Sequence, residues 1–288
     1  MSREARRARQ KEFVKGFNRL VGAYAPWQIW CDMVQMYACA IANSIPFSPH
    51  REKREKLYMD IIGKYSRDEM DIFANMVGLL VDTMEASVTV DGDYGDFLGE
   101  LFMELNLGNN LGGQFFTPYG VCLMMANCAW NDSIPREIER RGYIAANDCA
   151  CGAGATLIAF AQVCREKGVN YQRDVLFVGQ DIDSTTAMMC YIQLSLLGCA
   201  GYVHIGNTLT EPMTGHTLFG DNAETTWYTP MYYTDCWELR RIRARDRRIR
   251  QTETAAPPEP EARAEAGGQK LVVSDRKKNK GQIMMDLG

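Results

Sequence analysis

Apolar residues recur at helical spacing between residues 10 and 106, and strand patterns are few there. A helix is predicted to begin near Pro26, a favourable first-turn residue. Its buried face is marked by apolar residues three or four positions apart, namely Trp30, Val34, Tyr37 and Ile41. A second helix follows a capping box that begins at Ser66, and a third is expected over Asp96–Leu107. This pattern predicts a helical N-terminal domain over residues 1–105.

Beyond Gly142 the apolar pattern changes to an alternation of strands and helices. The predicted strands are Tyr143–Asn147, Asp174–Gly179 and Tyr202–Ile205. The first two strands are followed by a helix over Ala155–Lys167 and by a helix that Ser184 caps, with Asp183 acting beside Ser184 at its start, where negative charge is favoured. This order predicts an α/β fold with a parallel sheet and right-handed crossovers, within a core over residues 106–238.

The last segment, residues 239–288, differs in composition from the rest of the chain. An Arg-rich stretch is followed by TETAAPPEPEARAEAGG and then by a Lys-rich end. Such low-complexity sequence lacks the apolar residues that a packed core needs. We expect this tail to be disordered apart from an Arg-rich helical extension.

Charge is distributed very unevenly along the chain. The formal net charge is −4, yet residues 1–20 carry +5, residues 240–250 carry +6 and residues 270–280 carry +4. The remainder therefore carries −19. Basic ends on an acidic body indicate contact with a polyanion such as DNA. The alternative is that these basic runs are solvated helix faces or tails.

The overall composition excludes several classes of protein. With 288 residues, 46% of them hydrophobic, the chain is globular and is neither collagen-like nor wholly disordered. It has no uninterrupted apolar run of 18 residues and no apolar signal region at its start, so a membrane or secreted location is not expected. The ten cysteines include no CxxC pair, which favours reduced thiols in the cytoplasm. Only three histidines are present, so no metal site is expected.

The most informative motif lies where the first predicted strand gives way to a helix. This segment reads NDCACGAGA from Asn147 to Ala155. Gly152 and Gly154 allow a tight turn and a close approach of backbone to ligand. Leu157 stands where the dinucleotide fingerprint has its third glycine, which weakens an NAD or FAD interpretation.

Polar residues also end the second and third predicted strands. Asp181 ends the second strand, where its carboxylate is suited to ribose hydroxyl groups, and Asn207 follows the third. Because parallel strands end at the same edge of a sheet, these side chains are expected to meet the glycine turn at one crevice. The pattern indicates a nucleoside-containing ligand. The alternative is that all three strand ends carry ordinary capping residues.

Together these motifs resemble the modification-subunit family of type I restriction systems, which are S-adenosylmethionine-dependent adenine-N6 DNA methyltransferases. The resemblance rests on GQFFTP at Gly113–Pro118, on DCACGAGA, on GQDID and on GNTL, and covers roughly residues 94–210. It implies a Rossmann-like methyltransferase sheet, S-adenosylmethionine as cofactor, DNA as a partner, and either a specificity subunit or another protein that completes the site. The N-terminal helices resemble the DNA-facing helical domain of that family.

The resemblance also implies roles for individual residues of this chain. The GQFFTP element closes over the methionine part of the cofactor in the family, which assigns that role here to Gln114, Thr117 and Pro118. The glycine turn wraps the amino-acid end of the cofactor, Asp181 binds the ribose, and Asn207 lies near the adenine. The turn residues implied in cofactor binding are Asp148, Ala150, Gly152 and Gly154.

One family motif is missing from this sequence. Adenine N6 is a weak nucleophile, and family members hold it with an Asn/Asp-Pro-Pro-Tyr/Phe loop after the fourth strand. This tetrapeptide does not occur here. The nearest substitute is the segment from Thr229 through Pro230 to Tyr232, in which the hydroxyl would accept a hydrogen bond and the ring would stack on the base. The alternative is that this segment forms an edge strand.

The length of the chain bears on its function as well. After Asn207 only 81 residues follow, and many of them lie in the tail, so we expect the methyltransferase sheet to be incomplete. Two functions remain open: an adenine-specific DNA methyltransferase, and a catalytically inactive module that binds S-adenosylmethionine and DNA. A third, methylation of a protein glutamine or a small molecule, agrees less well with the basic ends.

Overall fold

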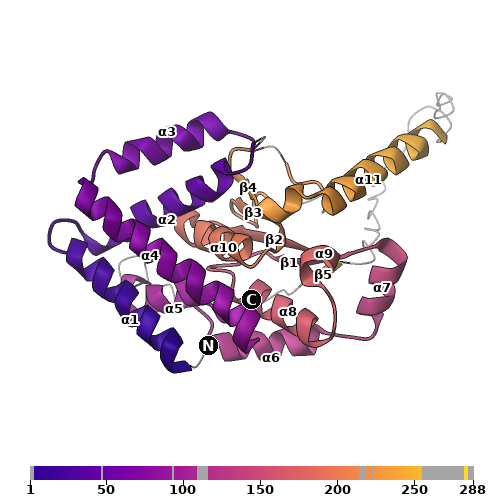
Figure 1. Cartoon of the computed structure of the whole chain (residues 1–288). Coiled ribbons are helices and arrows are strands. Elements are labelled where there is room, and N and C mark those ends of the chain that lie inside the picture. Colours follow the sequence, from indigo (N-terminus) through magenta and orange to yellow (C-terminus); the bar gives the residue numbers. More distant parts are fainter. Residues whose placement is uncertain are drawn as a thin grey trace, which may run out of the picture.

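A computed structural model describes residues 3–46, 48–92, 94–108, 116–213, 218–221, 223–254 and 282–284. Its first part is a helical N-terminal domain, drawn in indigo to magenta in Figure 1. The α-helices of this part are α1 (Arg3–Leu20), α2 (Pro26–Asn43), α3 (Arg51–Ile62), α4 (Arg67–Ala86) and α5 (Phe97–Glu104). A short π-helical segment, η1 (Ser87–Asp91), follows α4.

The predicted starts of two of these helices are confirmed. Helix α2 begins at Pro26, and Trp30, Val34 and Tyr37 lie on its buried side. At the start of α4, the backbone N–H of Ser66 donates to the Glu69 carboxylate at 2.7 Å, and the Glu69 N–H donates to the Ser66 hydroxyl at 3.4 Å. This reciprocal capping box fixes where α4 begins.

Helix α4 is a core helix of this domain. By length and composition alone, Arg67–Thr89 is the one helix in the described ranges that is apolar enough to cross a membrane, a test that core helices also pass. Its inner side chains Phe73, Met76 and Leu80 are buried. The carbonyl of Phe73 also accepts the hydroxyl of Tyr37 at 2.6 Å. These contacts pack the inner side of α4 into the domain, and 39% of the apolar window is buried.

A five-stranded sheet in the order β4-β3-β2-β1-β5 forms the second part. Its strands are β1 (Ile144–Asp148), β2 (Val175–Asp181), β3 (Ala200–Ile205), β4 (Thr226–Tyr228) and β5 (Gln282–Met284). All adjacent pairs are parallel except β3 and β4, which are antiparallel. The helices around it are α6 (Tyr119–Ala129), α7 (Ser133–Arg141), α8 (Ala155–Glu166), α9 (Tyr171–Asp174), α10 (Ser184–Leu196) and α11 (Asp235–Thr254).

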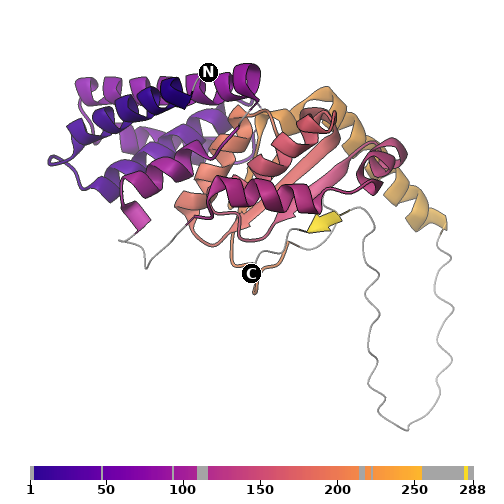
Figure 2. The same ribbon diagram turned by 90° about the horizontal axis from the view of Figure 1, so that it is seen from below.

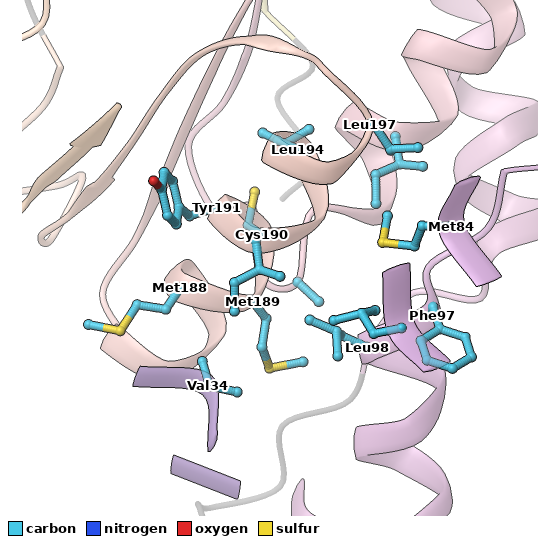
Figure 3. Packing of buried hydrophobic residues seen from close by; sticks show 14 of the residues in the cluster. Val34, Met84, Phe97, Leu98, Met188, Met189, Cys190, Tyr191, Leu194 and Leu197 are labelled. Atoms are coloured by element: carbon cyan, nitrogen blue, oxygen red, sulfur yellow. The ribbon is translucent and has the colours of Figure 1, made fainter. Parts of the chain in front are cut away.

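The central strands are buried on both faces of the sheet. In β2, Val175 and Phe177 belong to the larger apolar cluster, and Leu176 and Val178 to the smaller one on the other face. Helix α10 joins the sheet to the N-terminal domain: Figure 3 places its residue Met189, and Leu197 just after its end, beside side chains of the N-terminal helices, including Leu98 and Met84. The two parts therefore share one continuous core.

The sheet confirms the predicted fold class, an α/β Rossmann-like sheet that is incomplete and follows a helical N-terminal domain. The parallel strands β3, β2, β1 and β5 lie side by side in the order expected for the first four strands of a doubly wound sheet. Within the described residues, the fifth strand of the sheet is β4, which pairs antiparallel with β3 and forms one edge. Figure 2 shows the short strand β5, in yellow, at the opposite edge.

Three details differ from the sequence-based expectation. Asp183, and not Ser184, caps α10, because its carboxylate accepts the backbone N–H of Thr186 at 2.8 Å. The Arg-rich extension is indeed helical, as α11, but the expected disorder of residues 255–281 and 285–288 lies outside the described residues. Gln282–Met284, which we expected to be part of a disordered tail, pairs with β1.

Candidate functional site

After β1 the chain forms a turn, and the Asp148 carboxylate accepts hydrogen bonds from both sides of this turn. Oδ1 of Asp148 accepts the backbone N–H of Ala150 at 3.0 Å, and Oδ2 accepts the hydroxyl of Thr156 in the first turn of α8. Burial raises the pKa of the Asp148 carboxyl, and the hydrogen bonds from Thr156 and Ala150 counter that rise. Asp148 therefore holds the backbone of the turn in a fixed shape.

Asp181, the last residue of β2, links this turn to the neighbouring strand. Its Oδ2 accepts the backbone N–H of Gly152 at 2.8 Å, and its Oδ1 accepts the N–H of Asp183 at 2.9 Å. The N–H of Cys151 donates to the carbonyl of Gln180 at 2.9 Å. An ionised carboxylate offers about four acceptor positions, so Asp181 can still accept hydroxyl groups from a ligand.

Two glycines make the turn compact. Gly152 (φ +50°) and Gly154 (φ +96°) adopt left-handed backbone conformations. A Cβ atom on Gly154 would lie 2.8 Å from Sγ of Cys190, and one on Gly152 would lie 3.1 Å from the ring of Phe116. The ring of Phe116, which belongs to the Gly113–Pro118 motif, therefore packs directly on the glycine turn.

A buried hydrogen-bond network connects the turn to the N-terminal domain. Asp96 caps α5, and its Oδ1 accepts the N–H of Gly99 at 2.9 Å and Nε2 of Gln193 at 2.7 Å. The same Nε2 donates to the carbonyl of Ala153 at 2.8 Å, while Oε1 of Gln193 accepts the N–H of Leu98 at 3.1 Å. Burial raises the pKa of the Asp96 carboxyl.

These segments enclose a cleft of about 230 Å³ at the carboxyl ends of β1 and β2. The cleft is lined by Asp96, Phe116, Thr117, Cys122, Asp148, Ala150, Cys151, Gly152, Ala153, Ala155, Thr156, Asp181 and Thr186. Three of these lining residues carry a carboxyl group, and no Lys, Arg or His is among them. The cleft therefore favours a ligand that carries positive charge.

The structure brings most of the expected cofactor residues to this cleft. Those that line it are Thr117, Asp148, Ala150, Gly152 and Asp181. Pro118 and Gly154 lie next to it in the chain, at the starts of α6 and α8. Asn207 does not line the cleft, and its Oδ1 accepts the N–H of Leu209 at 2.9 Å. Gln114 lies outside the described residues.

Sequence reasoning missed several residues that line the cleft. Asp96 was assigned only to a helix, since nothing in its local pattern distinguishes a cap from a ligand-facing carboxylate. Phe116 lies within the GQFFTP motif but carried no role. Thr156 is the second residue of α8, and its hydroxyl donates to the Asp148 carboxylate. A hydroxyl residue so close after the glycine turn is a signal that the sequence did contain.

The segment that could replace the missing tetrapeptide lies beside the amino end of β3, whereas the cleft lies at the carboxyl ends of β1 and β2. Thr229 is fully buried, and its hydroxyl donates to the carbonyl of Cys199 at 2.7 Å, beside the start of β3. Pro230 opens a short 3₁₀ helix, η3 (Pro230–Tyr233), and the edge strand β4 ends just before it, at Tyr228. The buried Tyr232 hydroxyl donates to the carbonyl of Leu218 at 3.0 Å.

This placement sets Thr229, Pro230 and Tyr232, the candidates for the missing catalytic tetrapeptide, apart from the cleft. Strand β4 runs antiparallel to β3, so it carries the chain away from the cleft. None of the three residues lines the cleft, and the two hydroxyl groups are already hydrogen-bonded within the fold. Their contacts are those of packing residues.

Comparison with known families agrees with the arrangement of these motifs. The model of the N-6 DNA methylase family matches residues 94–282, which is more than half of the chain. The chain belongs to the N-6 DNA methylase family. The family region begins just before Asp96 and ends at the first residue of β5, so it includes the whole cleft and the strands β1, β2 and β3.

Two solved structures are similar to this chain at low identity. One is a putative class I S-adenosylmethionine-dependent methyltransferase from Listeria monocytogenes, with 13% identity and a TM-score of 0.37 over 75% of this chain and 58% of that one. The other is a type I restriction-modification system methyltransferase subunit from Streptococcus thermophilus, with 21% identity and a TM-score of 0.36 over 68% of this chain and 43% of that one. The chain thus spans less than two thirds of either. No curated protein matches it.

Proposed function

We propose that this chain binds S-adenosylmethionine in the cleft and transfers its methyl group to N6 of adenine in DNA, as a modification subunit that acts with a specificity subunit. The observation that carries the proposal is the cleft itself, which combines the glycine turn, Asp181 and the Phe116–Thr117 segment at one edge of the sheet. Membership of the N-6 DNA methylase family supports the same reaction.

The residues of the cleft suit this cofactor. S-adenosylmethionine carries a sulfonium, an ammonium and a carboxylate, so its net charge is positive and complements a cleft lined by carboxyl groups. Gly152 lacks the Cβ atom that would stand between the turn and the ring of Phe116. The spare acceptor positions of Asp181 suit ribose hydroxyls.

Each part of the chain has a distinct task in this reaction. The bound cofactor supplies an electrophilic methyl group. Asp181 orients the ribose, the backbone of the turn holds the amino-acid end, and the ring of Phe116 shields one side from water. Met284 pairs with Asn147, so β5 ends at the same end of the sheet as β1, and there we expect a flipped adenine to meet the cofactor.

A row of cations on α1 suits the DNA backbone. Arg7, Lys11, Lys15 and Arg19 are all exposed and follow one another at steps of four residues. Four residues of helix rise about 6 Å, so these cations form a continuous row of positive charge along α1, which suits a polyanion. The start of α1 also lies near α5, because Arg6 donates to the carbonyl of Tyr94 at 3.0 Å.

Transfer of labelled methyl groups tests the proposal. The full chain is incubated with S-adenosylmethionine labelled at the methyl group and with unmethylated DNA, both alone and with candidate specificity subunits. We expect label in N6-methyladenine after digestion to nucleosides. Absence of label in adenine under every combination would contradict the proposed reaction.

A second function is favoured by one specific observation. The sequence has no Asn/Asp-Pro-Pro-Tyr/Phe tetrapeptide, and Thr229 and Tyr232 are buried away from the cleft. A module that binds S-adenosylmethionine and DNA without catalysis would need only the cleft and the cations of α1. The same experiment separates the two functions, because such a module would bind both ligands and transfer no label.

A further inference from the structure

Asp96 is the carboxylate of the cleft whose acceptor capacity is least used. It is only 4% exposed, and it lines the cleft. Both hydrogen bonds that it accepts end on Oδ1, from Gly99 and Gln193. Within the described parts of the chain, Oδ2 has no hydrogen-bond partner. Asp148 and Asp181, by contrast, each accept through both oxygens.

Capping of α5 does not account for a carboxylate at this position. The cap needs only the Oδ1 contact with the N–H of Gly99, which an Asn or Ser side chain provides equally well. A buried carboxylate costs more free energy than a buried amide or hydroxyl unless a cation pairs with it. A neighbouring cation is Arg6, but its guanidinium donates to the carbonyl of Tyr94 and to the carboxylate of Glu100.

The place of Asp96 in the cleft indicates which part of a cationic ligand it meets. Gln193 bridges Oδ1 of Asp96 and the carbonyl of Ala153, so this carboxylate lies on the side of the glycine turn. The resemblance assigns that turn to the amino-acid end of the cofactor. The ribose end is assigned to Asp181, on the next strand.

We propose that Asp96 binds the α-ammonium group of S-adenosylmethionine through Oδ2, which makes it a cofactor-binding residue of this site. The inference rests on the proposed function and adds a specific recognition contact to it. An ammonium group has three donors and a full positive charge, so it can provide the charge-assisted hydrogen bond that Oδ2 lacks.

A double-mutant-type cycle tests this contact: the protein, the ligand, or both are changed, and the four affinities are compared. Wild type and Asp96→Asn are titrated by calorimetry with S-adenosylmethionine and with an analogue in which hydrogen replaces the α-amino group. We expect Asp96→Asn to weaken S-adenosylmethionine about 10- to 100-fold, the usual range for a charge-assisted hydrogen bond, and to leave the analogue within about twofold. Loss of the amino group should weaken binding to wild type by the same factor.

Asp181→Asn is the matched control, because it removes a carboxylate that faces the ribose. It should weaken both ligands equally. Asp96→Ser, which keeps a capping oxygen, gives the same cycle if the Asn variant folds poorly, and the comparison of the two ligands on wild type needs no variant at all.

The possible results separate the contact from the function. Equal weakening of both ligands by Asp96→Asn, or equal binding of both ligands by wild type, would overturn the role of Asp96 and leave the proposed function standing. If wild type binds neither ligand, the cleft is not a site for this cofactor, and both proposals fall.

Discussion

The backbone N–H of Gly152 donates to Oδ2 of Asp181 at 2.8 Å, which joins the turn after β1 to the end of β2. This bond and the one from the N–H of Asp183 use two of the about four acceptor positions of the carboxylate, and the others stay available at the cleft. The glycine turn and the carboxylate are thereby held together before any ligand binds. Such preorganisation reduces the entropy that binding has to overcome.

Gly154 should tolerate alanine less well than a glycine of similar backbone conformation elsewhere. Both Gly154 (φ +96°) and Gly168 (φ +78°) are left-handed, but only at Gly154 would a Cβ meet a neighbour, Sγ of Cys190 at 2.8 Å. We expect Gly168→Ala to lower the free energy of unfolding by about 1 kcal/mol and Gly154→Ala by about 2 to 4 kcal/mol. Urea unfolding measures both, and equal losses would contradict the close packing at Gly154.

Tyr232 should matter for stability and not for methyl transfer. Its hydroxyl donates to the carbonyl of Leu218, and its ring lies 4.9 Å from that of Tyr228 in the smaller apolar cluster. Tyr232→Phe should lower the free energy of unfolding by about 1 kcal/mol and leave S-adenosylmethionine affinity and any transfer rate unchanged. A tenfold or larger fall in the methyl-transfer rate, with stability retained, would show that Tyr232 takes part in catalysis.

The buried Asp96 carboxyl should make stability depend on pH in a particular direction. Burial raises its pKa in the folded state, so the folded protein keeps a proton that the unfolded chain releases near pH 3.9. Between that pH and the folded pKa, the contribution of Asp96 to the free energy of unfolding falls as pH rises.

Without ligand, Asp96→Asn should therefore gain stability relative to wild type as pH rises through this window. The gain should be about 1.4 kcal/mol for each unit by which the pKa is raised. Urea unfolding of both proteins at several pH values measures it. A difference that stays constant with pH would show that Asp96 titrates alike in the folded and unfolded states.

The cations of α1 should govern the salt dependence of DNA binding. Replacing Lys11 and Lys15 with alanine should weaken binding and reduce the slope of log affinity against log salt by about two. Lys53 and Lys56 serve as the control, since both are exposed but already pair with carboxylates, those of Glu224 and Asp60. Fluorescence anisotropy over a salt series measures the slopes. Equal effects of the two double variants would contradict a specific role for α1.

Much of the sheet and its polar edge could be predicted from sequence because the signals there are local. Glycines, strand-end aspartates and apolar runs specify the turn after β1 and the end of β2 within a few residues. Strands β1, β2 and β3 begin and end within two residues of their predicted limits. Asp181 could be placed at the cleft because the geometry of parallel strands brings their carboxyl ends to one edge.

The rest of the site depends on contacts between distant segments. Asp96 reaches the cleft only because Gln193, 97 residues further along the chain, holds it against the glycine turn. The segment Thr229–Tyr232 had the right spacing for a catalytic loop, but the antiparallel pairing of β4 carries it to the other edge. Strand β5 has too few residues to stand out in a polar tail, and its place is set by pairing with β1.

Calorimetric titration of the full chain with S-adenosylmethionine, for wild type and Asp181→Ala, tests the central claim most directly. We predict saturable one-to-one binding by wild type and an affinity at least tenfold lower for Asp181→Ala, because the variant loses the ribose acceptor and the tie to Gly152. No binding by wild type, or equal binding by both proteins, would contradict the assignment of this cleft as the cofactor site.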